Sequence, residues 1–247
     1  MMRSLGKSWA VAKKNVRIYY LRGPVLIFGI LFPTFLFLAF AIGRNVPPAN
    51  LVPGLIGMTL FFTASATTPA VLPFETRTRT LERLLAAPVT LPMLVGGDVL
   101  AAFMFGLFLS MVPILLSFLV LDAVLTQPLM LVLSVLLSAV CFATLGTLFS
   151  TPPTDNPSSI MTISNLVRLP LIFVSGVFLP ISQMPAWGQW LSRLSPLTYT
   201  TELVRHATGD TTHIPAWACV LALVAFTLGF WWISLALHSR NMSRRLV

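Results

Sequence analysis

Six stretches of this sequence lack Asp, Glu, Lys and Arg, and each is long enough to cross a lipid bilayer. A helix of about 20 residues, rising ~1.5 Å per residue, spans a hydrocarbon core of about 30 Å. Backbone groups find no water to bond in lipid, so each crossing segment must be helical. The uncharged stretches cover residues 24–43, 45–74, 99–121, 123–154, 169–192 and 211–239. The sequence therefore predicts an all-α integral membrane protein.

The composition supports the same fold class, because 56% of the 247 residues are hydrophobic and only 9% are charged. A soluble domain carries about 25% charged residues. The first apolar segment exceeds the roughly 7–15 residues of a signal peptide's apolar region, so we expect it to stay as an anchor. We predict a single transmembrane domain over 1–247. Its six predicted spans cover residues 25–43, 51–73, 99–121, 129–150, 157–179 and 216–237.

The distribution of basic residues predicts the orientation. An even number of spans places both termini on one side of the membrane. With the termini inside, twelve Lys and Arg residues lie in inner segments and three in outer ones, the usual excess of basic residues on the cytoplasmic side. We expect both termini to be cytoplasmic and the protein to lie in the plasma (inner) membrane. The net charge of +9 is explained by contact with lipid headgroups and requires no nucleic acid.

The N-terminal segment, residues 1–22, has apolar residues at helical spacing: Leu5, Trp9, Ala12, Val16 and Tyr19. Four basic residues occupy other faces, namely Lys7, Lys13, Lys14 and Arg17. This pattern predicts an amphipathic helix lying in the inner membrane interface. The alternative is an ordinary basic flank to the first span.

The connection between the second and third predicted spans, residues 74–98, is predicted to lie in the cytoplasm and to contain a short helix. Thr80 is placed to cap it, and Pro88 discourages its continuation, which leaves about two turns. Leu81, Leu84 and Leu85 share one face. A helix this short is unstable alone, so it must dock against a membrane, a span end or a partner.

The connection between the last two spans, residues 180–210, is predicted to lie outside. Trp187 and Trp190 belong to a broad apolar face, and Pro196 separates this stretch from a second helical one. We expect a re-entrant helical hairpin that dips into the outer leaflet, where such structure must pack on protein or line a cavity. The alternative is a hairpin resting at the interface, where Trp is common.

The sequence contains no recognisable catalytic or metal-binding constellation. No predicted span contains Asp or Glu, and the histidines lack the spacing of a metal site. The motifs of serine hydrolases and of ATP-binding loops are also missing. Cys141 and Cys219 fall in predicted spans and are expected to be buried thiols. We therefore expect no catalytic residue, no metal and no bound cofactor in this chain.

Arg168 is the one basic residue expected deep within a span. Such a charge costs about 2.5–3.5 kcal/mol or more on insertion scales, so it should face protein or water. One interpretation is an electropositive point in a translocation path that favours an anionic or polar group. The other is a structural residue that reaches the headgroups or bonds a carbonyl of a neighbouring span. The sequence leaves both open.

Two segments resemble the permeases of the ABC type-2 export family. TRTRTLERLLAAPV, residues 76–89, is similar to the family's first cytoplasmic loop, which carries a coupling helix. FVSGVFLPISQMPAWGQWLSRLSPLTYTTELVRH, residues 173–206, resembles the segment around the family's fifth span. The order of six spans, N-terminal amphipathic helix and re-entrant hairpin is similar too. Arg168 stands where the family usually has an apolar residue.

The resemblance implies a permease that forms a dimer, most simply a homodimer, and pairs with a separate ATP-binding subunit that holds ATP and Mg. Phe173, Phe178 and Pro180 would help form an outer gate, with Trp187 and Trp190 over the exit. ATP-driven closure of the partner would push the coupling helices together. The residues that this resemblance assigns to coupling are Arg79, Leu81, Glu82, Arg83, Leu84 and Leu85.

The function expected on these grounds is export of drugs, lipids or other amphipathic cargo. Two other classes remain open. An autonomous channel or ion-coupled carrier would need acidic or broken-helix ion sites. A membrane-embedded enzyme would need a catalytic constellation.

Overall fold

The computed structural model describes residues 2–21, 29, 31–32, 34–35, 39, 51–87, 89–119 and 124–245. The predicted first span, 25–43, lies mostly outside these residues. The described part of the chain forms helices and turns, with no strand, as an all-α fold requires. Its elements are α1 (Met2–Asn15), η1 (Val16–Tyr20), α3 (Val52–Ala66), α4 (Thr68–Arg77), α5 (Thr80–Ala86), α6 (Leu91–Leu119), α7 (Pro128–Phe149), α8 (Pro157–Val174), η3 (Ile181–Gln183), α9 (Ala186–Ser192), α10 (Pro196–Thr208) and α11 (Ala216–Arg245).

Five of these helical segments are long and apolar enough to cross a membrane, counted over the described residues. They fall where the last five spans were predicted, because each long uncharged run folds as one helix or, for α3 and α4, as two consecutive ones. The total of six spans stays a prediction. The five segments are Val52–Arg77, Leu91–Leu119, Pro128–Phe149, Pro157–Val174 and Ala216–Asn241.

Among the segments that extend further than predicted, two contain carboxyl groups in their extensions. The segment formed by α3 and α4 continues to Arg77 and includes Glu75, while α6 begins at Leu91 and includes Asp98. The expectation that no span contains Asp or Glu is therefore wrong. Both side chains are buried against α1, which lies beside them and supplies polar partners.

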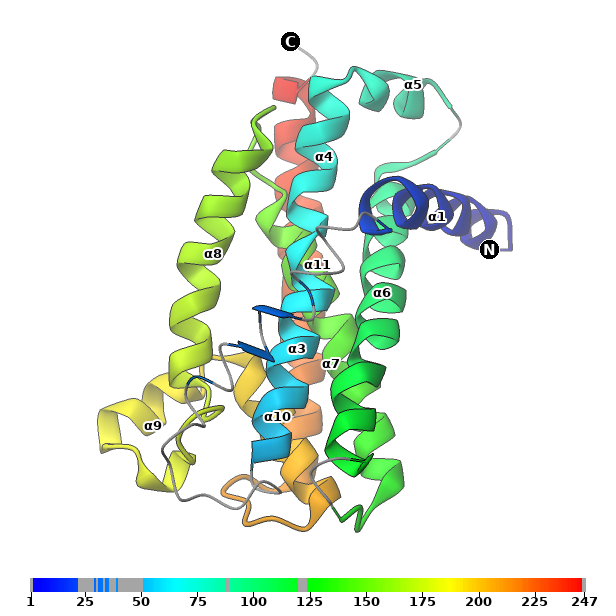
Figure 1. The fold of residues 1–247 in the computed structure, drawn as a ribbon. Helices are drawn as coiled ribbons and strands as arrows, with labels where there is room; N and C mark the ends of the chain where they lie inside the picture. Colours follow the sequence, from blue (N-terminus) through cyan, green and yellow to red (C-terminus); the bar gives the residue numbers. More distant parts are fainter. Residues whose placement is uncertain are drawn as a thin grey trace.

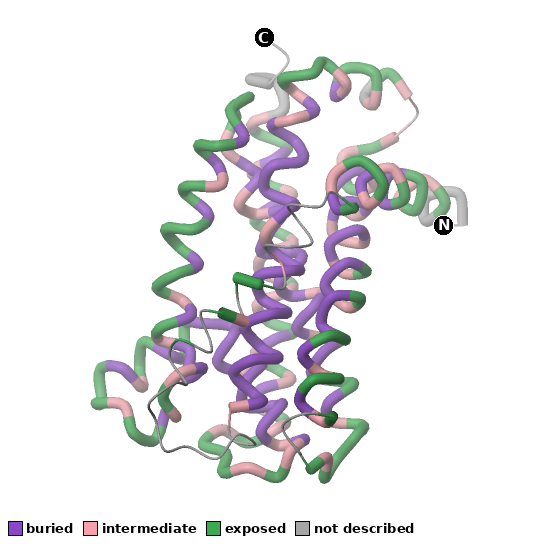
Figure 2. The backbone as a smooth tube through the Cα atoms, viewed as in Figure 1, coloured by how far each residue is buried: buried purple, intermediate pink, exposed green. Residues whose placement is uncertain are grey.

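The long helices form an upright bundle, with α1 lying across it near one end (Figure 1). The same end carries α5 and the last turns of α11, and α9 lies at the opposite end. Figure 2 shows that α3 and α4 are buried along most of their length, whereas α8 is exposed on much of its surface. The centre of the bundle is thus the helix pair that leads directly into α5.

Close packing around α3 depends on small residues. A Cβ atom added to Gly106 of α6 would lie 2.8 Å from the Cβ atom of Ala64, and one added to Gly146 of α7 would lie 3.1 Å from the carbonyl oxygen of Ser65. Helix axes approach this closely only when a side chain is missing at the contact. Phe61 and Phe142 fill the adjoining core edge to face, with ring centroids 5.0 Å apart.

Candidate functional site

The short helix α5 follows α4 after a sharp turn at Arg79. The backbone of Arg79 is in the left-handed region, with φ of 53°, and this residue occupies the N-cap position. Thr80 lies inside the helix, and its hydroxyl donates to the carbonyl oxygen of Glu75 at 3.3 Å. The prediction that Thr80 caps the helix is wrong, because the left-handed turn one residue earlier directs its side chain back toward α4.

The apolar face of α5 packs on the protein itself. Leu81 is 1% exposed and belongs to a cluster with Val11, Leu72 and Leu94, to which Leu84 also packs. Leu81 is therefore not placed at a surface that a partner could contact, contrary to the role that the resemblance implies for it. The side chain of Leu85 lies outside the described residues. These contacts join α5 to α1, α4 and α6.

The outward side of α5 is charged. Arg79, Glu82 and Arg83 are exposed, as is Arg77 at the end of α4. We call these four residues the α5 charged face. Apart from Leu85, the structure thus divides the predicted coupling residues into an inner apolar group, which fixes the helix, and an outer charged group, which is free to meet a partner.

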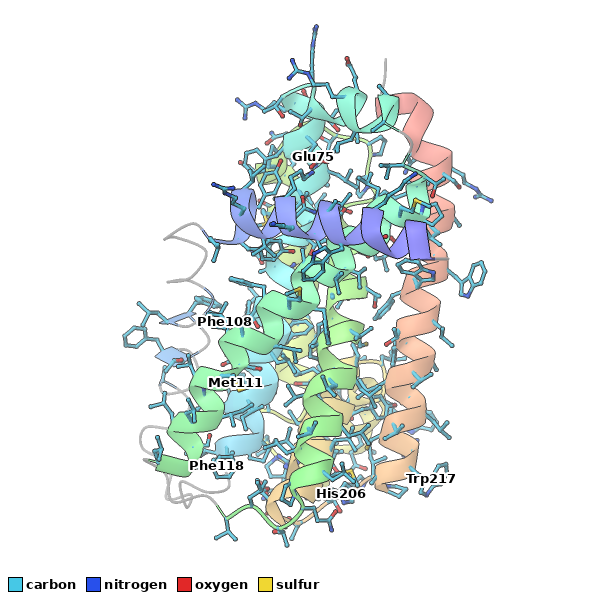
Figure 3. The ribbon with its side chains drawn as sticks, turned by 90° about the vertical axis from the view of Figure 1, so that its right-hand side faces the viewer. Glu75, Phe108, Met111, Phe118, His206 and Trp217 are labelled. Carbon is cyan, nitrogen blue, oxygen red and sulfur yellow. The ribbon has the colours of Figure 1, made fainter. Side chains whose placement is uncertain are left out.

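A buried polar network connects α1 to α4 and α6 near α5. The ammonium group of Lys14 forms an ion pair with Glu75, and the side-chain amide of Asn15 donates to the carboxylate of Asp98. Figure 3 shows Glu75 between α1 and the turn that leads into α5. Sequence reasoning placed both carboxyl groups in a loop, and only the helical continuation of α4 and α6 reveals that they are buried.

Tyr20 extends the same network to the break between α3 and α4. Its hydroxyl lies 2.9 Å from that of Thr68, and its ring packs edge to face on Phe105 with centroids 4.9 Å apart. Burial raises the pKa of Tyr20 above its ordinary value, so the phenol stays protonated. The N-terminal helix is thereby attached to α4 and α6 by polar contacts that are absent from a helix lying only on lipid.

Arg168 on α8 is buried, with 1% of its surface exposed. One terminal nitrogen donates to the carbonyl oxygen of Ser65, and the other donates to Asn165 Oδ1 at 3.3 Å. The guanidinium carbon lies 5.5 Å from the ring centroid of Phe149. The bond to a carbonyl of a neighbouring span, which the structural interpretation expected, is therefore present, and the role of Arg168 in a translocation path stays a prediction.

The carbonyl of Ser65 needs this donor because of Pro69. In a continuous helix the oxygen of residue 65 would accept from the N–H of residue 69, and proline has none. The missing bond coincides with the break between α3 and α4. The arginine therefore satisfies a carbonyl that the sequence of α4 leaves without a helical partner.

Arg168 also lines a cavity of about 390 Å³. The cavity lies between α3, α6, α8 and the described residues near position 30, and its other walls include Phe32, Phe62, Phe105 and Asn165. The Arg168 side chain therefore both donates a hydrogen bond to the protein and borders the cavity.

The predicted outer gate residues lie at the end of α8 near α9. The rings of Phe173 and Phe178 are 5.5 Å apart, with Phe173 exposed and Phe178 packed on the core. Gly176 lies between them with φ of 80°, which ends the helix, and Pro180 leads into η3. This geometry groups the three residues but leaves their gating role a prediction.

The two helices of the predicted hairpin differ in burial. Trp187 and Trp190 of α9 are each 71% exposed, and the guanidinium of Arg193 lies 4.9 Å from the Trp190 ring centroid. Most of α10 is buried, and this helix contacts α3, α7 and α11. One helix therefore presents aromatic rings outward while the next inserts into the bundle.

Glu202 anchors α10, a role that the sequence did not indicate. Its buried carboxylate accepts from Arg205 at 2.9 Å and from the backbone N–H groups of His213 and Ile214 at 2.7 and 3.1 Å. Arg205 also donates to the carbonyl oxygen of Gly176 at 3.0 Å. The pair therefore ties α10 to the end of α8 and to the start of α11, near His206 and Trp217 in Figure 3.

The described part of the chain offers no group of side chains for a metal ion. No three His, Cys, Asp or Glu side chains there could hold a metal ion. Cys141 and Cys219 are buried free thiols. The chemistry that the site offers is charge recognition at the α5 charged face and at Arg168.

Comparison with known proteins places this architecture in a family. The sequence pattern of the ABC-2 type transporter family matches residues 6–208. The chain is 27% identical over 195 residues to the inner membrane transport permease YadH of Escherichia coli K12, covering 79% of this chain and 76% of that protein. YadH of Shigella flexneri matches to the same extent. Nodulation protein J of Sinorhizobium fredii is 39% identical over 69 residues, which is 26% of either chain. The matched region includes α5, Arg168 and most of the network below them, and the chain belongs to the ABC-2 type transporter family.

Proposed function

We propose that this chain is the membrane-spanning permease subunit of an ATP-driven exporter and that α5 couples it to a separate ATP-binding subunit. Permeases of the ABC-2 family generally pair with such a subunit. The sequence has no ATP-binding loop of its own. ATP and Mg would therefore be held by the partner.

The observation that carries this proposal is the division of α5 into a buried apolar face and an exposed charged one. Leu81 fixes the helix on α1, α4 and α6, so a force applied to α5 reaches the central pair α3 and α4 without passing through a flexible loop. Arg79, Glu82 and Arg83 set charge complementarity with the partner. ATP-driven closure of the partner would then reorient the bundle.

The membrane topology completes the proposal. Residues 25–43 supply a sixth span, both termini lie in the cytoplasm, and the protein resides in the plasma (inner) membrane, as the name of its relative YadH indicates for that protein. On this view α1 lies at the inner interface, where half-exposed Trp9 meets lipid. The α9–α10 hairpin is then re-entrant from the outside, with Phe173, Phe178 and Pro180 at the gate and Trp187 and Trp190 over the exit.

A second copy of the chain completes the pore. The outward side of α8 is apolar and lacks a partner among the described residues, with Ile163, Leu166 and Val167 all exposed. Lipid or another α8 would cover such a surface. A homodimer brings two α5 helices to the same side of the membrane, which is the arrangement that a pair of ATP-binding subunits requires.

The test is ATP hydrolysis by the permease purified together with an ATP-binding subunit encoded beside it. Glu82→Arg reverses one charge on the exposed face and is expected to lower the permease-dependent hydrolysis about tenfold, through loss of complementarity. Arg193→Glu reverses a charge just after α9, at the other end of the bundle, and is expected to leave the rate unchanged. Unaltered hydrolysis in Glu82→Arg would refute the coupling role.

One observation favours a second function, that of an ion-coupled carrier. Glu75 and Asp98 are buried close to a single ammonium group, and buried carboxyl groups in spans are common in proton-coupled transporters. Transport by the purified chain alone in vesicles, driven by a proton gradient, would support this alternative against the exporter.

A further inference from the structure

The cavity beside α8 combines an apolar wall with one buried cation. Phe32, Phe62 and Phe105 supply aromatic surface, with the first two rings edge to face at 5.0 Å. Arg168 and Asn165, which are three residues apart on α8, supply polar groups. The volume of about 390 Å³ falls within the range of roughly 300–1,000 Å³ that small-molecule sites occupy.

The charge of Arg168 is not neutralised by any carboxylate that the structure describes. Of the seven acidic residues, Glu75 and Asp98 belong to the network under α5, and Glu202 and Asp210 surround Arg205. Glu82 and Asp155 are exposed. Asp122 lies outside the described residues. Residues 22–50, which contribute Phe32 to the wall, contain no Asp or Glu in their sequence.

The guanidinium also retains unused donors. It carries five N–H groups, and its bonds to Ser65 and Asn165 occupy two of them. The Nε atom is buried and has no hydrogen-bond partner among the described residues. Arg168 lines the cavity, so an anion bound there would neutralise a charge that no described carboxylate balances.

The partners already present hold the guanidinium in place for this role. The carbonyl of Ser65 is available because of Pro69, and the Phe149 ring lies against the guanidinium. Neither partner is negatively charged, so both orient the group without neutralising it. Binding an anion therefore requires little rearrangement of the side chain.

We propose that this cavity binds an anionic amphiphile, with the acidic group at Arg168 and the apolar body against the three phenylalanine rings. The inference rests on the proposed function in that such a molecule would be the exporter's cargo. The binding itself involves only the permease chain. It narrows the expected cargo from amphipathic compounds in general to those that carry a carboxylate, sulfonate or phosphate.

The test compares two fluorescent probes with the same aromatic skeleton, anilinonaphthalene sulfonate and its neutral analogue phenylnaphthylamine. Each is titrated into the full chain in discs of neutral phosphatidylcholine, with empty discs as the background. The unaltered protein is expected to bind the sulfonate more tightly than the neutral probe. Arg168→Met is expected to weaken sulfonate binding about tenfold, the loss of one charge-assisted contact, and to leave the neutral probe within about twofold.

Three further variants fix the interpretation. Arg168→Lys retains the charge without the planar fork and should give an intermediate affinity for the sulfonate. Met161→Trp fills the cavity and should weaken both probes, whereas Arg193→Met removes a basic residue elsewhere and should alter neither. Preference of the unaltered protein for the neutral probe overturns the proposal, and so does equal weakening of both probes by Arg168→Met. Unchanged binding of both probes in Met161→Trp would place them outside the cavity and overturn it as well.

These measurements need no ATP-binding subunit, so their outcome is separate from that of the coupling test. Selective sulfonate binding together with unaltered hydrolysis in Glu82→Arg would leave an anion site in a protein that is not driven through α5. Loss of selectivity together with impaired hydrolysis would leave an exporter whose cargo is not anionic.

Discussion

Lys14 of the N-terminal helix forms an ion pair with Glu75, two residues before α4 ends and the chain turns into α5. The carboxylate is buried, and the lysine is partly exposed. The pair thus connects a helix lying across the bundle to the central helix that carries the α5 charged face. Helix α1 therefore holds α5 in position through this pair.

Removing the lysine charge alone should destabilise the protein. Lys14→Met leaves the Glu75 carboxylate buried without its cation, at an expected cost of about 3 kcal/mol in the free energy of unfolding. The double variant Lys14→Met/Glu75→Gln should recover most of the loss, because it removes the unpaired charge. Thermal unfolding of the single and double variants measures both effects, and a double variant as unstable as Lys14→Met would contradict the explanation.

The contact between α1 and α6 should be sensitive to a single methyl group at Gly97. A Cβ atom there would lie 2.6 Å from the Cβ atom of Val11 and 2.9 Å from the carbonyl oxygen of Ser8. Gly97→Ala is therefore expected to cost about 1–3 kcal/mol by forcing the two helices apart.

Gly229→Ala is the matched control for this prediction. It places the same methyl group in open space on α11 and should instead stabilise the helix by about 0.5–1 kcal/mol. Equal unfolding temperatures for the two variants would mean that α1 does not pack tightly on α6.

Replacement of Arg168 should separate stability from anion binding. Arg168→Met removes an unneutralised buried charge and leaves one carbonyl without its donor, so the first effect should exceed the second by about 1 kcal/mol. We expect a slightly higher unfolding temperature together with the loss of sulfonate binding. A large drop in unfolding temperature would show that the hydrogen bond to Ser65 stabilises the protein by more than the buried charge costs.

The anchor of α10 should depend on the charge of Glu202. Glu202→Gln removes the carboxylate that accepts from Arg205 and from two backbone N–H groups, at an expected cost of about 3 kcal/mol. Asp210→Asn alters a longer contact to the same arginine, 3.8 Å, and should cost less than about 1 kcal/mol. Unfolding measurements on the two variants test whether the buried pair, rather than the peripheral one, holds the connection into α11.

The sequence predicted the helical fold class and the approximate positions of five spans, because an uncharged run longer than a bilayer is thick has few other structures available. It also identified Arg168 as a buried charge. Helix ends near Glu75 and Asp98 were not predictable in this way. A carboxyl residue at the end of an apolar run predicts the start of a loop. Only the contacts of Glu75 and Asp98 with α1 show that the helices continue through them.

The sequence also did not predict which side of α5 faces the protein. The spacing of Leu81, Leu84 and Leu85 predicted one apolar face, but periodicity does not say whether that face meets the protein or a partner. Only the position of Val11, Leu72 and Leu94 in space decides it. Glu202 was missed for a similar reason, since its donors His213 and Ile214 lie beyond the end of its own helix.

The most direct test of the central claim is cross-linking from α5 to the ATP-binding subunit. Glu82→Cys introduces an exposed thiol into a chain whose two native cysteines are buried, and Arg193→Cys does the same just after α9. A thiol-anchored photoreactive group at position 82 is expected to capture the ATP-binding subunit in intact membranes, while one at position 193 should not. Capture from position 193 alone, or from neither position in a complex that hydrolyses ATP, would contradict the assignment of α5 as the coupling helix.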